Sequence, residues 1–309
     1  MKLGQSMRDA SSPAGSDHLP AVAALALGAL MGACTLPAVA RADWAVSAGA
    51  QARYDDNVSN AQNYADKLSD EIVGATLSAY RVLPLGDSYL LTAGGELSGE
   101  WFDHLSGLRN ASVDGVVAVK RKWGLGALAP WVRASFAVGR SEFDASYRDV
   151  TTYRTALAAG KRLDERWNLW LEYSFEHRAA ADGETVEPGT SANAFTQNGH
   201  RLAASLEYSL SAKIYLDLGI FARRGDVVST VQSDGWIYAG ARAIEDDPAL
   251  GDDAYAYRVL GNSYGIQPGV SYALTEHSLL SCAYLRARTY AQGADYVRSV
   301  TELAWSYRF

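Results

Sequence analysis

The chain has 309 residues, 48% of them hydrophobic and 20% charged, and its formal net charge is −7 at pH 7. This acidic balance argues against a nucleic-acid partner, because proteins that bind nucleic acids carry basic patches. After residue 43 no apolar run approaches the roughly 20 residues that a membrane helix requires. The mean hydropathy of −0.12 suits a water-soluble protein, but it also suits a β-barrel whose alternating strands average to a neutral value.

Residues 1–42 have the organisation of a secretory signal peptide. Positive residues precede an apolar run, and Ala40-Arg41-Ala42 then matches the A-x-A cleavage pattern. We therefore expect a mature domain of residues 43–309. Lipidation at Cys34 is the alternative, although its cleavage box is poorer. Cleavage at the A-x-A site leaves Cys282 as the single cysteine, which excludes an intramolecular disulfide and a cysteine metal cluster.

From the mature start onward, segments of about ten residues alternate between apolar and polar side chains. This period of two is typical of strands with two different faces. The twelve apolar faces, in chain order, lie within Trp44–Tyr54, Val73–Ala79, Tyr89–Leu97, Val113–Val119, Val132–Val138, Tyr153–Ala159, Leu169–Phe175, Leu202–Tyr208, Ile214–Ile220, Ile266–Tyr272, Leu279–Ala287 and Leu303–Phe309. Aromatic residues are frequent at the segment ends, as expected for side chains at the two membrane interfaces.

The connections between these segments alternate between short and long. The short ones lie near residues 84–87, 124–126, 164–166, 209–211 and 275–277, and the long ones near 56–69, 103–110, 142–150, 177–198, 225–262 and 291–295. Outer-membrane barrels have short periplasmic turns, longer extracellular loops and an even number of strands. A water-soluble β-sandwich also alternates, but its connections do not sort by length in this way. The predicted fold is therefore all-β, a single antiparallel transmembrane β-barrel of about 12 strands.

The end of the chain carries a second signal of location. Leu303–Phe309 is an alternating strand with Trp305, Tyr307 and a final Phe309, and it resembles the C-terminal signature of Gram-negative outer-membrane proteins. The resemblance implies the cell outer membrane as the location, and the barrel assembly machinery as a partner. Tyr54-Asp55-Asp56-Asn57, after the first strand, resembles proteobacterial barrels of the porin type, some of which accompany exopolysaccharide genes.

Charged residues gather on the face opposite to the apolar one. An Arg or Lys that faces lipid at the midplane costs about 2–4 kcal/mol, so this placement indicates a polar interior. The predicted lumen-lining residues are Arg53, Asp55, Glu96, Asp114, Lys120, Arg133, Arg154, Glu172, Arg201, Glu207, Asp217, Arg286, Arg288, Arg298 and Glu302. They either line a water-filled channel or pair across the lumen and close it. Small inward residues favour a narrow channel, and the near balance of charges predicts weak charge selectivity.

Three further features have more than one interpretation. The connection at residues 226–260 combines aromatic and acidic residues, which suit a folded-in constriction, sugar or cation binding, or a solvated extracellular loop. Asp55-Asp56-Asn57 offers oxygen ligands for calcium, or simply begins a solvated loop. A hydrolytic site requires a nucleophile and a base within hydrogen-bond reach. His104 or His177 with Asp144 or Ser141 is the combination left open.

The sequence therefore predicts a passive outer-membrane channel for small polar solutes or short saccharides, not an enzyme, with no cofactor and no metal. The partners expected are outer-membrane lipid and lipopolysaccharide, the barrel assembly machinery and the solute. The first alternative is a non-conducting structural barrel linked to secretion or to surface polysaccharide export. The second is an outer-membrane lipid hydrolase.

Overall fold

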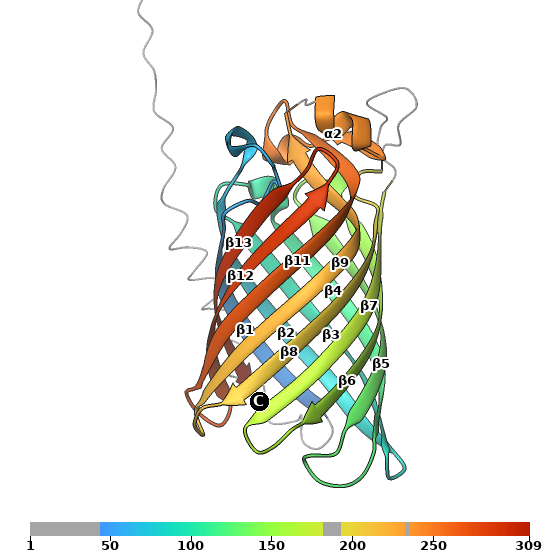
Figure 1. Cartoon of the computed structure of the whole chain (residues 1–309), viewed down its shortest axis with the longest axis vertical. Coiled ribbons are helices and arrows are strands. Elements are labelled where there is room, and N and C mark those ends of the chain that lie inside the picture. Colours follow the sequence, from blue (N-terminus) through green and yellow to red (C-terminus); the bar gives the residue numbers. More distant parts are fainter. Residues whose placement is uncertain (1–43, 182–192, 233–234) are drawn as a thin grey trace, which may run out of the picture. The chain divides into compact units, whose positions relative to one another are not determined.

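The computed structural model describes residues 44–181, 193–232 and 235–309 of the chain (Figure 1). The expected signal peptide, residues 1–42, lies outside these ranges, and its cleavage stays a prediction. Among the described residues, no helix is both long enough and apolar enough to cross a membrane.

Twelve long strands form the wall of a barrel, and one short strand is added to them (Figure 1). The wall strands are β1 (Trp44–Asp55), β2 (Asp70–Leu85), β3 (Tyr89–Phe102), β4 (Asn110–Lys122), β5 (Trp131–Phe143), β6 (Val150–Arg162), β7 (Trp167–Ala180), β8 (Gln197–Ser209), β9 (Ile214–Val231), β11 (Tyr255–Ala273), β12 (Ser278–Ala291) and β13 (Tyr296–Arg308). The added strand is β10 (Ala243–Asp246). The helical segments described are η1 (Tyr64–Asp66), η2 (Ser106–Leu108), η3 (Ser146–Arg148), α2 (Gly235–Gly240) and η4 (Pro248–Leu250).

The wall closes on itself. Each wall strand pairs antiparallel with its neighbours in chain order, and β1 meets β13 at the seam, where Ala50 lies opposite Trp305. Since β9 pairs directly with β11, the added strand β10 interrupts nothing in the wall. Closure leaves the wall without a free strand edge, whose polar groups hydrocarbon cannot satisfy. The predicted all-β antiparallel barrel is therefore confirmed, with twelve strands in its wall.

The outer surface of the wall is apolar. Residues that oppose each other on neighbouring strands point to the same face. The register therefore shows which side chains face outward all around the barrel. Large apolar side chains on the outer parity remain exposed, among them Leu97 at 56%, Leu157 at 55% and Leu202 at 59%. Such a continuous apolar exterior is unfavourable in water and suits hydrocarbon. A closed barrel with this exterior is an outer-membrane barrel, which agrees with the predicted location.

The two ends of the barrel differ in their connections. One end, here called the turn end, carries short links such as residues 86–88 and 163–166, together with Trp44 and Arg308 at the ends of the wall (Figure 1). The other, here called the loop end, carries long connections such as residues 56–69. Short turns are periplasmic in barrels of this kind, so the loop end faces the cell exterior.

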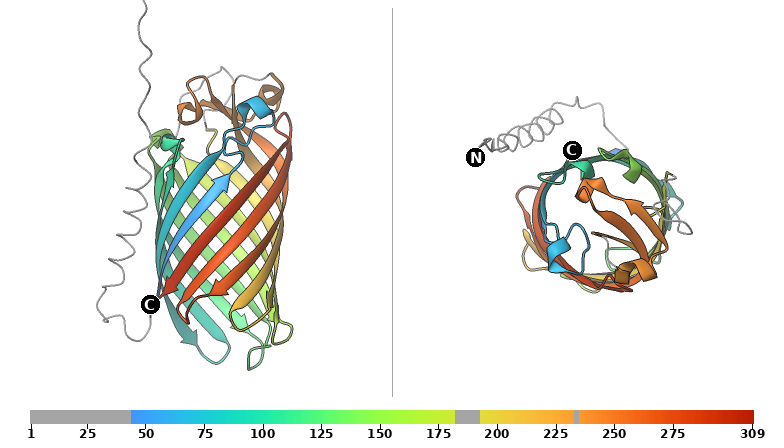
Figure 2. Two further views of the ribbon diagram at one scale, coloured as in Figure 1. Left: turned by 90° about the vertical axis from the view of Figure 1, so that its left-hand side faces the viewer. Right: turned by 90° about the horizontal axis from the view of Figure 1, so that it is seen from above.

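At the loop end, chain segments fold over the mouth of the barrel (Figure 2). We call residues 56–69, 144–149, 226–232 and 235–260 the cap. Beyond Gly225, β9 and β11 continue as paired arms, and β10 extends them to a three-stranded sheet. Gly225 has a φ of 159°, and a Cβ there would lie 2.2 Å from a backbone oxygen of β8. Only glycine therefore fits where the arms leave the wall.

The cap is built like the core of a water-soluble protein. Three clusters of buried apolar residues hold it together, and they are centred on Ile237 and Val259, on Val150 and Phe195, and on Ile72 and Phe102. Burying one such side chain stabilises a fold by about 1.5–3 kcal/mol. Within 226–232 and 235–260 these buried residues pack across the mouth, while others, such as Trp236 at 82%, remain exposed.

One predicted face is wrong, namely that of β12. The pairing places Cys282 opposite Leu303, which is 51% exposed on the outer surface. Arg286 and Arg288 share the parity of Cys282 and are also exposed on the outside, so they do not line the lumen. The prediction failed because β12 has apolar side chains on both faces, Leu285 inward among them. Arginine is tolerated on the outer surface near a membrane interface, where its cost falls to about 0–1 kcal/mol.

Candidate functional site

The other predicted lumen residues lie on the inner face of the wall. The paired register places them on the same side as Arg298 and Glu302, which line an internal cavity. They are Arg53, Asp55, Glu96, Asp114, Lys120, Arg133, Arg154, Glu172, Arg201, Glu207, Asp217, Arg298 and Glu302. Their part in solute passage stays a prediction.

Several of these charges are paired across the lumen surface. Asp55 is buried, and Nε of Arg298 donates to its two carboxylate oxygens at 3.1 and 2.9 Å. This arginine occupies the carboxylate that a calcium ion would need, so the calcium interpretation of Asp55-Asp56-Asn57 loses its main ligand. Three more ion pairs lie on the inner face: Arg53–Glu100 at 2.9 Å, Arg133–Glu172 at 3.4 Å and Arg154–Glu176, with Nε donating at 3.0 Å.

Like charges also meet on the inner face, which charge counting does not reveal. Directly opposed residues of like charge are Glu96 and Asp114, Glu207 and Asp217, Lys120 and Arg133, and Arg201 and Arg223. Opposed like charges destabilise a sheet unless solvent or a ligand screens them. Aromatic rings relieve part of the cationic repulsion, because Lys120 lies over Trp131 at 4.2 Å and Arg201 over Phe221 at 4.7 Å.

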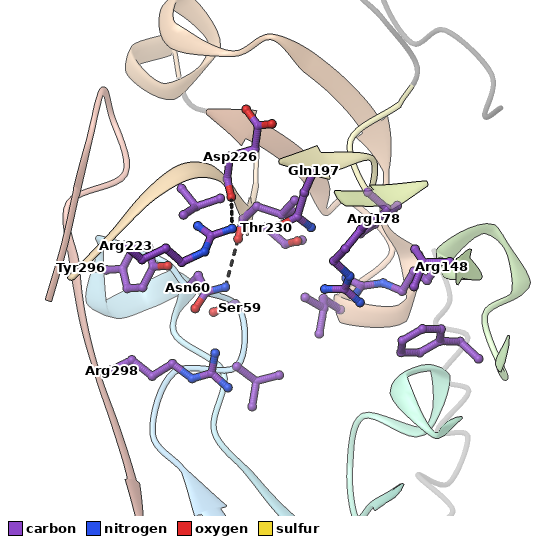
Figure 3. A pocket seen from close by; sticks show the side chains of 17 residues that line it. Ser59, Asn60, Arg148, Arg178, Gln197, Arg223, Asp226, Thr230, Tyr296 and Arg298 are labelled. Carbon is purple, nitrogen blue, oxygen red and sulfur yellow. Dashed lines mark hydrogen bonds between the residues drawn. The ribbon is translucent and has the colours of Figure 1, made fainter. Parts of the chain in front are cut away.

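Four arginines gather just beneath the cap. A cavity of about 270 Å³ there is lined by Arg148 of η3, Arg178 of β7, Arg223 of β9 and Arg298 of β13 (Figure 3). We call it the arginine cavity. Its single acidic lining residue, Asp226, already accepts hydrogen bonds from Arg242 at 3.4 Å and from the backbone N–H of Asn198 at 2.9 Å.

Two of the four guanidinium groups lack a carboxylate. Arg298 pairs with Asp55 and Arg148 pairs with Asp247, whereas Arg223 donates only to the backbone oxygen of Asp226, at 2.9 Å. Within the described part of the chain, Arg178 forms no ion pair; the carboxylate of Glu176 acts on it from a distance, and the positive charges of Arg148 and Arg223 lie nearby (Figure 3). The cavity thus presents an excess of positive charge to whatever enters it.

Two further cavities continue from this one along the same side of the lumen. A cavity of about 360 Å³ shares Asn60, Arg223 and Arg298 with the arginine cavity. A third, of about 310 Å³, shares Gln267 and Glu302 with the second and includes Asp217 toward the turn end. Together they form a chain of spaces from beneath the cap into the lower lumen, in which charged and polar side chains alternate with apolar ones.

The cap above the arginine cavity is fastened by one buried carboxylate. Asp247 is fully buried and pairs with Arg148, whose Nε donates at 2.9 Å. It also accepts hydrogen bonds from the Tyr147 hydroxyl at 2.9 Å and from Thr230 Oγ1 at 2.6 Å. Burial raises the pKa of Tyr147 to about 12, so this hydroxyl remains a donor at physiological pH. We call these four residues the Asp247 latch.

Sequence reasoning missed two members of the arginine cavity. Arg178 has the parity of Glu172 and Glu176 on the same strand, so the period of two could have assigned it to the lumen. Arg148 belongs to a loop, where no periodicity operates, and it meets an aspartate 99 residues later in the chain. Only the folded cap brings these two together.

The residues considered for hydrolysis are engaged elsewhere. His104 Nδ1 lies 3.1 Å from Asp70, and His177 Nδ1 lies 2.9 Å from the side-chain oxygen of Asn198. Ser141 Oγ accepts a hydrogen bond from Ser112 Oγ at 2.8 Å. Among the described residues, no hydrogen bond or ion pair joins either histidine to Ser141 or to Asp144.

The C-terminal aromatic residues form a continuous ladder on the outer face. The rings of Trp305 and Tyr307 stack with centroids 6.1 Å apart, and Tyr307 meets Phe309 edge-on at 5.1 Å. Recognition of this ladder by the barrel assembly machinery stays a prediction.

Comparisons with known proteins define the fold and no more. No family model matches the chain, and no curated protein matches it. An outer membrane channel from Pseudomonas putida F1 shares 13% identity, with a TM-score of 0.56, over 89% of this chain and 100% of that one. The NanC porin shares 10% identity, with a TM-score of 0.48, over 85% of this chain and all of that one. The β domain of the Bordetella autotransporter BrkA shares 12% identity, with a TM-score of 0.45, over 87% of this chain and all of that one.

Proposed function

We propose that the protein is a porin-like channel of the outer membrane that passes small polar solutes or short saccharides. The observation that carries this proposal is the chain of three cavities from the cap into the lower lumen, each of which includes charged side chains in its lining. A barrel that served only as a scaffold has no need of such spaces, because small barrels fill their interiors with side chains.

The arginine cavity refines the proposal toward negatively charged solutes. Counting charges over the whole lumen predicts weak selectivity, but ions respond to the charges at the narrow places they pass. Arg178 and Arg223 provide guanidinium groups that form no salt bridge among the described residues, and arginine forks match carboxylate and phosphate groups. Acidic saccharides or small organic acids therefore fit this site better than neutral or cationic solutes.

Conductance of the purified protein in planar bilayers tests the channel directly. We expect discrete conductance steps and, in a KCl gradient, a reversal potential that indicates chloride preference. The variant R178Q/R223Q should shift this potential toward the value of a non-selective pore. R166Q, an exposed turn residue at the other end, serves as the control and should leave it unchanged. A silent barrel contradicts the channel, and a cation-selective one contradicts the anion preference.

The alternative is a structural barrel without conductance, and the cap is the observation that favours it. Three buried clusters and the Asp247 latch hold the cap across the mouth. If the cap never opens, the cavities are closed reservoirs. Wild type and a variant with an opened cap, compared in the same bilayers, separate a gated channel from a barrel that is closed throughout.

A further inference from the structure

Besides Arg140, which pairs with Asp149 at 3.2 Å, the outer surface of the barrel carries three arginines toward the loop end. Arg224 lies on the outer parity of β9, and Arg286 and Arg288 lie on that of β12. All three are exposed, and only β11 separates the two strands. Since neighbouring strands are about 4.8 Å apart, β9 and β12 lie roughly 10 Å from each other across the wall. We call these three residues the exterior arginine patch.

No carboxylate of the described chain neutralises the patch. The side chains directly opposite are His200 and Asn262 for Arg224, and Tyr264 and Val297 for Arg288. The nearest acid along β9, Asp226, is buried and already held by Arg242 and by Asn198. Among the described residues, the salt bridges include none of the three arginines.

Aromatic residues locate the patch at the membrane interface. The Arg288 guanidinium lies 4.7 Å from the ring centre of Tyr290, and Tyr290 packs edge-on against Tyr264 at 6.4 Å. Tyrosines prefer the headgroup level, where one part of the ring is wet and the other apolar. Uncompensated arginine is unfavourable deeper in the bilayer and tolerated at this level. The patch therefore faces lipid headgroups, not acyl chains and not open water.

A groove on the same surface has the polarity of a lipid molecule. It measures about 220 Å³ and includes Arg224, His200 and Asn262 at its polar side, and Leu202 and Ala222 on the side toward the membrane centre. The Tyr173 hydroxyl and His200 Nδ1 are 2.8 Å apart, which fixes the imidazole at the edge of the groove.

We propose that the exterior arginine patch binds the phosphate groups of a glycolipid in the outer leaflet, the headgroup chemistry that lipopolysaccharide presents. Arginine forks bind phosphate oxygens in pairs. A headgroup with two phosphates meets Arg224 and Arg288 together, while its acyl chains follow Leu202 and Ala222 down the wall. The patch lies at the extracellular end, which is the leaflet where such a lipid resides. This inference does not depend on the lumen being open.

Native mass spectrometry of the full protein in detergent tests the proposal, with diphosphorylated lipid A as the probe. A basic residue near a lipid headgroup contributes about fivefold in binding, so R224Q/R288Q should lose at least about tenfold in affinity. R121Q is the matched control, because Arg121 is an exposed outer-face arginine at the turn end and lies over Tyr89 at 5.3 Å. It should bind the lipid as wild type does.

Further measurements identify which chemical group of the lipid the patch recognises. Dephosphorylated lipid A should bind as weakly as the double variant, and inorganic phosphate at equal concentration should not compete. Equal loss in R121Q, equal binding of the dephosphorylated lipid, or full competition by inorganic phosphate would each overturn the proposal. If R224Q/R288Q does not fold, R224K/R288K keeps the charge but removes the forks, and a loss of a few fold is then expected. Unchanged binding in that variant contradicts bidentate recognition.

Discussion

The wall and the cap place their apolar side chains on opposite sides of the same strand. Along β9, Leu216, Leu218 and Ile220 point outward and remain exposed, whereas Val227 and Val231 are buried beyond Gly225. The wall is surrounded by hydrocarbon, so its apolar face must be the outer one. The cap is surrounded by water, so it hides its apolar groups inside. The apolar side chains change sides at Gly225, and this residue therefore marks where the membrane ends along β9.

The two regions also treat charge differently. The cap encloses Asp247 completely and gives it three donors. The wall leaves Arg224, Arg286 and Arg288 exposed on its outer surface, and none of them forms a salt bridge within the described residues. Buried charge in the cap consequently controls stability and closure, while charge on the wall remains accessible to solutes and lipids.

The largest effect is expected from breaking the latch with Asp247→Ala. Removing one partner of a buried ion pair costs about 3–5 kcal/mol, because it leaves the other charge unpaired. The cap should open, which should give faster protease cleavage within residues 235–260 and higher conductance. The barrel itself should stay folded, as measured by the change of its gel mobility on heating. Asp246→Ala, at the adjacent exposed position, is the control. Cleavage at the wild-type rate in Asp247→Ala would show that the latch does not hold the cap.

The next effect concerns the lipid-facing wall, which Leu218→Arg probes at mid-strand. Arginine at the midplane should lower the free energy of unfolding by about 2–4 kcal/mol. Arg288→Leu, near the loop end, should change it by about 1 kcal/mol or less. Urea unfolding in phosphatidylcholine vesicles, which contain no glycolipid, measures both. Equal effects at the two positions would mean that the interface does not lie where the tyrosines place it.

The same contrast explains what the sequence could predict. Alternation identified the wall because a lipid-facing strand must be apolar on every second residue, and it assigned Arg53, Asp55 and Glu302 to the lumen. It failed on β12, where Leu279 and Leu285 face inward and Tyr284 faces outward. Because both faces of β12 are apolar, alternation does not decide which face points outward. Tyrosines on the outer face were a signal that could have decided it.

A folded-in segment at 226–260 was one of three interpretations, but the contacts of the cap could not be predicted, for a different reason. Its contacts join residues far apart in the chain, such as Asn60 with Val228 and Arg148 with Asp247, on segments without a regular period. Such contacts follow from the three-dimensional path of the arms across the mouth, which local patterns do not encode. The charge balance of the lumen has the same limit, because position rather than number decides which charges remain free; the predicted weak selectivity stays a prediction.

A smaller effect is expected from pH, through Glu245 in the cap. Burial raises the pKa of Glu245 from its ordinary 4.5 to about 7, and a hydrogen bond from the Ala194 N–H at 3.2 Å opposes this only in part. Asp247 and Asp246 raise it further and Arg148 lowers it. A raised acid pKa means that the closed cap keeps a proton that the open cap releases. Closure is thus fully favoured below about 4.5, and this advantage is lost as the pH rises through about 7.

Conductance recorded from pH 5 to pH 8 measures this coupling. One proton changes the ratio of open to closed cap by at most about tenfold per pH unit. The wild type should open more as the pH rises, and Glu245→Gln should abolish this dependence and keep the cap closed at pH 8. Opening at low pH instead would contradict the assigned sign.

The smallest effect is expected at the turn end, where Asp164 orders a short exposed turn. Its carboxylate accepts hydrogen bonds from the backbone N–H groups of Arg166 at 2.7 Å and Trp167 at 2.8 Å, and these lower its pKa. Water replaces such bonds readily once Asp164 is changed to Ala, because the turn is fully solvated. Conductance, selectivity and the unfolding midpoint should all stay at wild-type values above pH 5. A closed or unstable barrel in this variant would mean that the turn end shares the gating role, and the functional contrast between the two ends would then disappear.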